Sequence, residues 1–332
     1  MRNFTIAILL AALGLAVACS RGVEIPNEFP TPPPIAAATP LAKLEMRPNA
    51  DLEREFEAIA ASAKGKVGVA AVVLETGDAA MLNGDQHFPM QSVYKLPISM
   101  AVMDQIRTGD HELDEKIGVA KDDMVREGQH SPLRDANPNG GEFTIRELIR
   151  LALVESDGTA SDVLMRVAGG PGDIQTYLTQ IGVRDMKVVN TEKEMGRDWE
   201  TQYQNWATPA ASADLLRQLD ASAGHWHPPN LDQDLTESQT LLQFMFESTP
   251  GAKRIKGLLP LKGPVSGVAH KTGTSGTQNG ITAATNDIGI IYMPNGKRLA
   301  IAVYVSDSAA DEKSREAVIA KLAKAAWDRF SK

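Results

Sequence analysis

The apolar positions near the start of the folded chain predict one helix followed by two strands. Within residues 51–64, apolar side chains recur at helical spacing at Leu52, Phe56, Ile59 and Ala60. The runs VGVAAVVLETG and AAMLNGDQHF are rich in Val and Ala, and the turn signal TGD separates them. We therefore expect a helix, a strand, a turn and a second strand.

The middle of the chain has a helical pattern. Four helices are expected, over residues 92–106, 144–155, 159–170 and 208–224. Thr144 and Glu147 have the spacing of a capping box. Thr208 is placed to cap the last helix, and Pro209 lies in its first turn. Pro97 cannot donate the hydrogen bond that would close the first turn of the first helix, so that turn is expected to be tightened or kinked.

The last third of the chain returns to strands and ends in a helix. The runs VSGVAHKTGT, DIGIIYM and RLAIAVYVS predict strands, and residues 312–330 predict an amphipathic helix. The pair Asn295-Gly296 between the last two strands predicts a hairpin. Because two strands alone are marginally stable, we expect strands from both ends of the chain to share one sheet.

This order of elements predicts the α+β class, with an antiparallel sheet flanked by helices and an inserted all-helical lobe. Residues 46–90 and 255–332 are expected to form the α/β lobe, and residues 91–254 the helical lobe. The cleft between the lobes is the default place for a binding site.

The N-terminus predicts export. Residues 1–18 hold one positive charge at Arg2, an apolar run too short to span a membrane and a small-residue step, AVA, which together indicate a signal peptide. Residues 19–45 form a proline-rich tether. We expect a periplasmic protein, either free or anchored to the outer membrane.

Cys19 is the only cysteine, so no internal disulfide is possible. Two interpretations of it stay open. An ordinary signal peptidase would cleave after Ala18, whereas LAVAC also resembles a bacterial lipobox in which Cys19 would be lipidated, although Ala16 stands where that motif usually has Leu. The tether favours the lipid anchor, because an extended spacer holds a domain off its attachment point.

Charge restricts the partners. The net charge is -8, and charges of both signs are interspersed without a basic stripe. This pattern argues against nucleic acid as a partner. We expect a monomer that needs no cofactor.

Ser92 and Lys95 form the first pair with catalytic potential. They lie three residues apart at the start of a predicted helix, so their side chains emerge on one face. N–H groups at a helix N-terminus favour negative charge developing on the serine, and a half-buried lysine loses its proton more easily. The pair therefore predicts an activated nucleophile, although S-x-x-K alone recurs by chance in a chain of this length.

Two further motifs follow in order. Ser156-Asp157-Gly158 lies at a corner between two predicted helices, and HKTGTS lies on a predicted strand, where its glycine lets a ligand approach the backbone. The set S-x-x-K, S-D-x and K-T-G, in this order and context, resembles the active site of the serine β-lactamases and penicillin-binding proteins. The resemblance extends over residues 46–331.

The resemblance implies a role for each motif residue. Ser92 would be acylated by the carbonyl of a β-lactam while Lys95 helps to remove its proton, and Ser156 would pass a proton to the departing nitrogen. The N–H groups of Ser92 and Thr274 would form the oxyanion hole. The substrate-binding residues on the strand, most of which would hold the substrate carboxylate, would be Lys271, Thr272, Gly273, Thr274 and Ser275.

Two substrate-binding positions depart from the commonest class A pattern or vary within it. Gly158 stands where an asparagine that contacts the side-chain amide of the substrate is usual, so altered substrate handling is expected. His130 falls where the family often has an aromatic wall, but it is equally consistent with an exposed loop histidine.

Deacylation separates three hypotheses. A class A hydrolase carries a glutamate on a loop between S-D-x and K-T-G, and Glu192 has the family's spacing for this base, whereas Glu194 misses it by two and is expected to be a solvated charge. The alternatives are a peptidoglycan carboxypeptidase or transpeptidase, and a sensor that stays acylated. Glu192 favours the hydrolase. The pattern QYQNW resembles a branch that includes extended-spectrum cephalosporinases.

The loop around Glu192 lacks the usual supports of class A enzymes. Asn190 and Asn205 stand where an arginine–aspartate ion pair is common, and Gly196 replaces an asparagine that helps to hold the deacylating water. We expect Asn190 and Asn205 to support the loop through an amide-to-amide bond, and the water to have a different second partner.

Two polar stretches resemble metal sites only in part. DANPNG resembles the start of a calcium loop, but Arg146 stands at its twelfth position. His225 and His227 have no acidic or cysteine partner at zinc spacing. We therefore expect no metal site.

Overall fold

The computed structural model describes residues 39–224, 226, 235–261 and 266–332, which all belong to one compact unit. The predicted signal peptide, Cys19, His225 and His227 lie outside the described residues. Within the described ranges, no helix is both long enough and apolar enough to cross a membrane.

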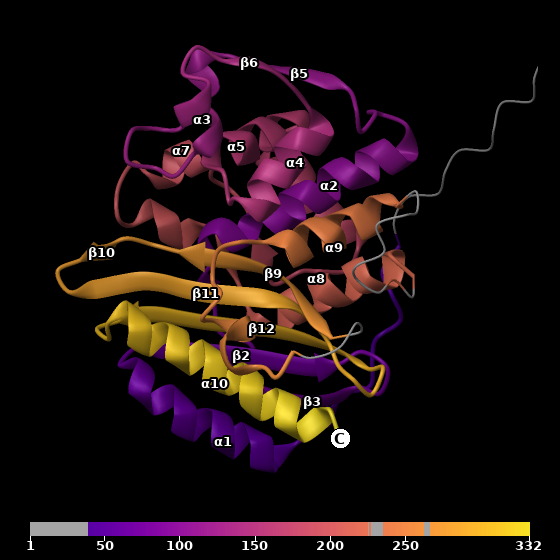
Figure 1. Ribbon diagram of the computed structural model, residues 1–332, viewed down its shortest axis with the longest axis vertical. Coiled ribbons are helices and arrows are strands. Elements are labelled where there is room, and N and C mark those ends of the chain that lie inside the picture. Colours follow the sequence, from indigo (N-terminus) through magenta and orange to yellow (C-terminus); the bar gives the residue numbers. More distant parts are fainter. Residues whose placement is uncertain (1–38, 225, 227–234, 262–265) are drawn as a thin grey trace, which may run out of the picture. The chain divides into compact units, whose positions relative to one another are not determined.

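A seven-stranded sheet joins the two ends of the described chain (Figure 1). Across the sheet the strands run in the order β1 (Arg47–Pro48), β3 (Asp78–Leu82), β2 (Lys66–Val73), β12 (Arg298–Ser308), β11 (Ile281–Tyr292) and β10 (Thr277–Gln278), and β9 (Gly267–Thr274) also pairs with β11. Among the described strands of this sheet, only β1 and β3 pair in parallel. The pairing of β2 with β12 confirms that strands from both ends of the chain share one sheet.

The predicted hairpin connects β11 and β12. Gly296 has a φ of 80°, the left-handed conformation that glycine adopts without strain, and the N–H of Met293 donates to the carbonyl of Lys297 at 2.9 Å. The sequence signal at Asn295-Gly296 is therefore confirmed.

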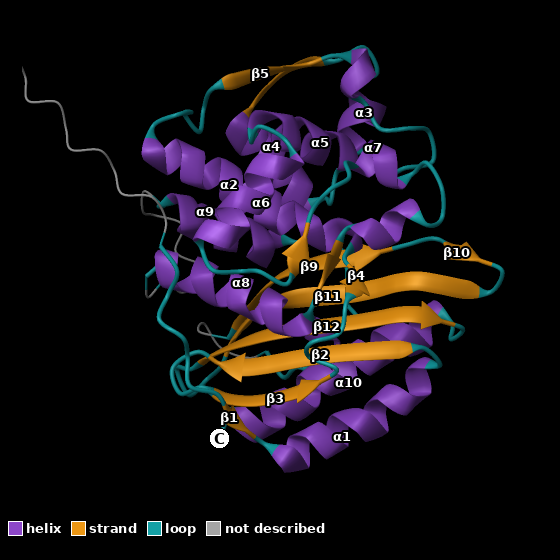
Figure 2. Ribbon diagram, turned by 180° about the vertical axis from the view of Figure 1, so that it is seen from behind, coloured by secondary structure: helices purple, strands orange, loops and turns teal. Residues whose placement is uncertain are grey.

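Successive residues of β12 face two separate cores, because side chains alternate across a strand. Leu299, Ile301 and Val303 pack with the helices α1 (Ala50–Ala60) and α10 (Glu312–Phe330), which cover one face of the sheet (Figure 1). Ala300, Ala302 and Tyr304 face the other core, where α8 (Pro209–Ser222) covers β2 and β12 (Figure 2).

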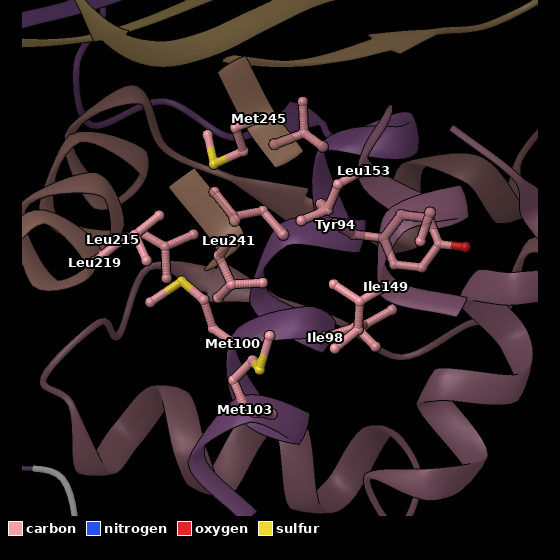
Figure 3. Close-up of a cluster of buried hydrophobic side chains, with 14 of the residues drawn as sticks. Tyr94, Ile98, Met100, Met103, Ile149, Leu153, Leu215, Leu219, Leu241 and Met245 are labelled. Atoms are coloured by element: carbon pink, nitrogen blue, oxygen red, sulfur yellow. The ribbon is translucent and has the colours of Figure 1, made fainter. Parts of the chain in front are cut away.

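The second core continues into a group of helices. These are α2 (Lys95–Thr108), α4 (Ile145–Val154), α5 (Gly158–Val167), α6 (Pro171–Gln180), α8 and α9 (Glu237–Glu247). Figure 3 shows Ile98, Met100 and Met103 of α2 among side chains of α4, α8 and α9. All nine residues of α2 from Lys95 to Met103 are buried, so its N-terminal end is held on every side.

Short elements complete the described chain. The 3₁₀ turns are η1 (Ala61–Ala63), η2 (Gln91–Tyr94), η3 (Lys121–Asp123), η4 (Thr201–Gln204) and η5 (Ile255–Leu258). The short helices are α3 (Pro132–Ala136) and α7 (Glu192–Met195). Two small sheets pair β5 (Lys116–Val119) with β6 (Gly141–Thr144), and β8 (Trp206–Ala207) with both β4 (Phe88–Pro89) and β7 (Met186–Lys187).

The predicted helix signals agree with the structure. Thr144 and Glu147 form the capping box of α4, and the hydroxyl of Thr208 accepts from Ala211 N–H at 3.1 Å. The first turn is tightened as Pro97 required, since η2 precedes α2. The middle region also contains β5 and β6, which the prediction of helix throughout this region missed, because strands of four residues are too short to show a period.

Candidate active site

Ser92 lies in η2, directly before α2, and its side chain meets that of Lys95. Lys95 Nζ lies 2.8 Å from Ser92 Oγ, 3.1 Å from the main-chain oxygen of Ser156 and 2.9 Å from Glu192 Oε2. Its side chain is only 1% exposed. An ammonium or amine held by three oxygens away from water has a fixed position, which suits proton transfer with the serine.

A glycine lets the strand β9 approach the nucleophile. A Cβ on Gly273 would lie 2.4 Å from the main-chain oxygen of Met90 and 3.3 Å from Ser92 N. Any side chain at Gly273 would therefore push β9 away from η2. The glycine of the K-T-G motif thus brings the strand against the turn that carries Ser92.

Gln91, the residue before the nucleophile, forms a side-chain hydrogen bond that the sequence did not reveal. Gln91 has a φ of 47°, unusual for a residue with a side chain. Its buried amide donates to Gln202 Oε1 at 2.6 Å. Gln202 lies in η4, within the same loop region as Glu192, so this bond ties the nucleophile turn to the loop.

Ser156 forms the corner between α4 and α5. It has a φ of 60°, and its hydroxyl accepts from Lys271 Nζ at 2.9 Å. Asp157 caps α5 by accepting from Ala160 N–H at 2.8 Å, and its fully buried carboxylate also accepts from Leu133 N–H at 2.6 Å. These bonds fix the corner that aims Ser156 toward the strand.

Lys271 is fully buried on β9 beside the corner. Its Nζ donates to Ser156 Oγ and to the carbonyl of Thr272, both at 2.9 Å. Burial, and then the charge of Lys95, lower the pKa of Lys271 well below its ordinary value. A bound anion would offset both effects, so the position suits recognition of a carboxylate.

The hydroxyls that follow Lys271 have different surroundings. Thr274 Oγ1 accepts from the buried guanidinium of Arg254 at 2.8 Å, a cation that sequence reasoning missed. Ser275 Oγ accepts from Ala284 N–H at 2.8 Å, so its hydroxyl already serves the neighbouring strand β11. Thr272, Thr274 and Ser275 all line the cleft.

Glu192 reaches the same point from the other side, as the first residue of α7. Its Oε2 accepts from Lys95 Nζ at 2.9 Å and from the hydroxyl of Tyr94 at 3.0 Å. Burial alone would raise the pKa of Glu192, but the charge of Lys95 and these hydrogen bonds leave that pKa below its ordinary value. The carboxylate is therefore ionised at neutral pH, as a general base must be.

Glu194 has a local structural role in addition to that of the expected solvated charge, since its side chain is 45% exposed. Its Oε2 accepts from Thr191 N–H at 2.9 Å, and the hydroxyl of Thr191 accepts from Glu194 N–H at 3.1 Å. The two residues form a capping box at the start of α7. The three-residue spacing of Thr191 and Glu194 in the run TEKE is the sequence pattern that predicts such a capping box.

Asp162 on α5 holds the main chain of the loop. Its carboxylate accepts from Glu192 N–H at 2.6 Å and from Lys193 N–H at 3.0 Å. Burial raises the pKa of Asp162 to about 7, despite these two bonds. No motif or spacing pointed to this residue, which lies within a regular helix.

Asn205 supports the loop by a different bond from the one expected. Its Oδ1 accepts from Asn190 N–H at 2.9 Å and from Val189 N–H at 2.8 Å, and its Nδ2 donates to the carbonyl of Asn190 at 2.8 Å. The side chain of Asn190 donates instead to Gln204 Oε1 at 3.0 Å. The prediction of a hydrogen bond between the two side-chain amides is therefore wrong, because the side-chain amide of Asn205 bonds main-chain groups of Val189 and Asn190 instead.

Gln129 fills the space beside Gly196. A Cβ on Gly196 would lie 2.6 Å from Gln129 Nε2. The Gln129 amide donates to the carbonyl of Glu192, and its Oε1 accepts from Arg126 N–H at 3.0 Å. A longer side chain from another loop thus occupies the place beside Gly196 and holds Glu192.

Gly158 is required by the approach of Glu192. A Cβ there would lie 2.8 Å from Glu192 Cγ and 3.1 Å from the main-chain oxygen of His130. The ring of His130 bonds the carbonyl of Glu155 at 2.9 Å and lies on the wall of the cleft.

The cleft has a volume of about 620 Å³. The predicted site residues on its walls are Ser92, Lys95, His130, Ser156, Glu192, Thr272, Thr274 and Ser275. Among the described residues, no group of three or more His, Cys, Asp and Glu side chains could hold a metal ion.

Comparison with known proteins gives consistent matches. Residues 51–330 match the Beta-lactamase enzyme family. Beta-lactamase VEB-1 of Pseudomonas aeruginosa is 36% identical, over 84% of this chain and 90% of that protein. Extended-spectrum beta-lactamase PER-1 of the same organism is 37% identical, over 83% and 86%. The crystal structure of TLA-3 extended-spectrum beta-lactamase aligns with a TM-score of 0.78 and 40% identity, over 85% of this chain and 99% of that one.

Proposed function

The chain belongs to the beta-lactamase enzyme family and is a class A serine hydrolase of β-lactams, a source of antibiotic resistance, and we propose that Ser92 and Glu192 carry the two steps of its reaction. One observation supports this division of roles between Ser92 and Glu192: Lys95 Nζ contacts both Ser92 Oγ and Glu192 Oε2.

In the acylation step, Ser92 Oγ attacks the lactam carbonyl while Lys95 takes the hydroxyl proton. The C–N bond of the ring then breaks, and Ser156 passes a proton to the departing nitrogen. The contact that supports this step is Lys271 Nζ to Ser156 Oγ at 2.9 Å, through which a protonated Lys271 can replace the proton that Ser156 gives up. Lys95 keeps the serine proton and returns it to Ser92 Oγ when the ester is hydrolysed. The N–H groups of Ser92 and Thr274 stabilise the oxyanion.

In the deacylation step, Glu192 takes a proton from a water molecule that attacks the ester, and the Ser92 hydroxyl is regenerated. Among the described residues, hydrogen bonds from the protein reach the side-chain carboxylate of Glu192 only at Oε2, so Oε1 is left for water. This base distinguishes the hydrolase from a sensor that remains acylated and from a peptidase acting on peptidoglycan.

Substrate binding rests on the β9 side of the cleft, where Thr272 and Thr274 lie on the wall and the buried cations Lys271 and Arg254 lie behind them. We propose that Thr272 and Thr274 bind the substrate carboxylate and that Lys271 and Arg254 add positive charge from behind. The names of PER-1 and TLA-3 include extended-spectrum activity, which supports the proposal that this chain also hydrolyses cephalosporins broadly. Comparing kcat/KM for a penicillin and for cephalosporins with bulky side chains tests this breadth.

Replacing the base tests the central proposal. Glu192→Gln keeps the size of the side chain but removes its basicity, so Ser92 should acylate and the ester should persist. Mass spectrometry after mixing with a chromogenic cephalosporin should show the mass of the adduct, while the wild-type protein turns the substrate over. A variant without accumulated adduct, beside intact wild-type turnover, would overturn the role of Glu192.

We also propose that the chain acts as a monomer in the periplasm, exported by residues 1–18 and held to the outer membrane by a lipid on Cys19 through the tether over residues 19–45. Cys19→Ala should move the protein from the membrane fraction to the soluble periplasmic fraction with activity unchanged. Equal partition of both forms would contradict the anchor. Light scattering on the protein without residues 1–19 would test the monomer.

A further inference from the structure

Tyr94 lies between the nucleophile and the lysine in sequence, and its hydroxyl, like Lys95 Nζ, reaches the base. The residue is fully buried. Figure 3 shows its ring beside Leu153 and Ile149, with the hydroxyl oxygen directed out of the apolar cluster. That oxygen lies 3.0 Å from Glu192 Oε2 and 3.1 Å from Ser161 Oγ.

The direction of these two hydrogen bonds is fixed by chemistry. An ionised carboxylate only accepts, so Tyr94 must donate its single proton to Glu192, and it accepts from the hydroxyl of Ser161. Burial, and then the charge of Glu192, raise the pKa of Tyr94 well above its ordinary value. Tyr94 therefore remains a neutral donor at neutral pH.

Both donors to Glu192 reach the same oxygen. Lys95 Nζ lies 2.9 Å and the Tyr94 hydroxyl 3.0 Å from Oε2. Tyr94 is the last residue of η2 and Lys95 is the first residue of α2. A carboxylate held by one oxygen at two points cannot rotate freely about its last torsion. Oε1 then keeps one orientation, and Glu192 lines the cleft.

We propose that Tyr94 is a positioning residue for deacylation, whose hydroxyl holds Oε2 of Glu192 and leaves Oε1 as the atom that takes the proton from the attacking water. This inference rests on the proposed role of Glu192 as base. It assigns Tyr94 no part in binding the substrate, because Tyr94 does not line the cleft.

The proposal predicts a change in pH dependence. The ionised form of Glu192 is favoured by Lys95 and Lys271 and by the hydrogen bond from Tyr94, and disfavoured by burial and by the nearby Asp162. Removing the hydroxyl removes a hydrogen bond that is stronger to the ionised form than to the protonated form. The pKa of Glu192 should rise, so the acid limb of deacylation should move to higher pH.

Tyr94→Phe tests the proposal, with Tyr304→Phe as the matched control. Tyr304 is also fully buried, and its hydroxyl bonds Ser212 at 2.7 Å between β12 and α8, away from the cleft. Tyr94→Phe should slow deacylation about tenfold, within the range for a lost hydrogen bond to a charged group, and move the acid limb up by about one pH unit. Acylation should change less than deacylation.

The control should show a comparable fall in Tm with acylation, deacylation and the pH profile unchanged. Ser161→Ala keeps the bond from Tyr94 to Glu192 but removes the group that orients the hydroxyl, so it should shift the acid limb in the same direction by a smaller amount. This second variant gives the same readout if Tyr94→Phe folds poorly. An unmoved acid limb in either folded variant would overturn the proposal.

The two proposals fail separately. If Glu192→Gln traps the ester but Tyr94→Phe leaves the deacylation rate and acid limb unchanged, Glu192 remains the base and the role of Tyr94 is wrong. If Glu192→Gln traps no ester, the base assignment itself is wrong. A trapped ester in Glu192→Gln with slower deacylation and a shifted acid limb in Tyr94→Phe supports both.

Discussion

The two sides of the cleft are built in different ways. Ser92, Lys95 and Lys271 lie on η2, α2 and β9, where regular hydrogen bonding and buried side chains determine their positions. Glu192 lies on a helix of four residues in an irregular segment between β7 and β8. Single side chains hold that segment, through bonds from Asp162, Asn205 and Gln129 to its main chain.

The difference separates the two chemical steps. Many contacts hold each of these regular elements in place. Substituting one neighbouring residue should therefore displace the acylating groups little. The loop depends on a few polar bonds, each of which fixes the base that deacylation needs. Substitutions behind the loop should therefore slow deacylation selectively, whereas those on the nucleophile side should stop acylation.

The largest effect is expected from Lys95→Ala on the nucleophile side. Without its amine, proton removal from Ser92 loses its acceptor, and acylation should slow roughly a hundredfold to ten-thousandfold. Pre-steady-state mass spectrometry should show the free protein and little adduct. Lys66→Ala is the control, because Lys66 is exposed on β2 and paired with Asp307.

A rapid and complete acylation of Lys95→Ala would break the comparison, because it would place the acylating base on the loop side with Glu192. The Lys66→Ala variant should keep wild-type rates in both steps.

The next effect is expected from Asn205→Ala on the loop side. This change leaves N–H groups of Val189 and Asn190 without their acceptor, which should lower the free energy of unfolding by about 1–3 kcal/mol. Deacylation should slow roughly tenfold or more while acylation stays close to wild type. Burst kinetics would separate the two rates.

Asn295→Ala is the matched control, since Asn295 also bonds a main-chain carbonyl, that of Phe330 at 2.9 Å, but on the distant hairpin. Equal slowing of both steps in Asn205→Ala would show that the loop also positions the nucleophile, through the bond between Gln91 and Gln202.

A smaller effect is expected where Gln129 meets Gly196. Gly196 has a φ of -76°, so alanine fits its backbone, but the new methyl group would displace the Gln129 amide from Glu192. Deacylation should slow about fivefold, or ~1 kcal/mol. In a Gln129→Ala background the same change should have no further effect, and a double-mutant cycle on the deacylation rate measures this coupling. Additive effects would show that the two positions act independently.

The smallest effect on turnover is expected from Asp162→Asn, because asparagine keeps a side-chain oxygen that can accept from the loop main chain, and its main effect is on stability. Its pKa is raised from an unfolded value of about 4 to about 7 in the folded protein. Between these values the folded state binds a proton that the unfolded state has lost, so the contribution of Asp162 to stability should fall as pH rises from about 4 to about 7. Denaturant titrations across this range should show a flatter profile for Asp162→Asn. An unchanged slope would contradict the raised pKa.

The chain order of motifs was sufficient to find the acylating groups. Ser92 and Lys95 share a helix turn, so three residues of spacing bring their side chains together. The S-D-x corner and the K-T-G strand were found in the same way, because a helix cap and a strand are local structures. The structure brings these groups into contact with each other at Ser156 and Lys271.

The residues that hold Glu192 and its loop could not be predicted, because their contacts are not local in the sequence. Asp162 lies thirty residues from its partner Glu192, inside a helix whose pattern says nothing about the loop. Asn205 was identified as a support, but its actual acceptor and donor are main-chain groups, which carry no sequence signal. Gln129 and Tyr94 also act across long separations in the chain.

By itself, the sequence determined the helices and strands that carry the acylating residues, their order and the identity of those residues, because helix periodicity, caps and short motifs depend on neighbours along the chain. Only the tertiary structure decided how Glu192 is held, which of its oxygens accepts from Lys95 and Tyr94, and why Gly158 and Gly196 have no side chain. These features depend on contacts between loops that packing alone brings together, and packing is a property of the whole fold.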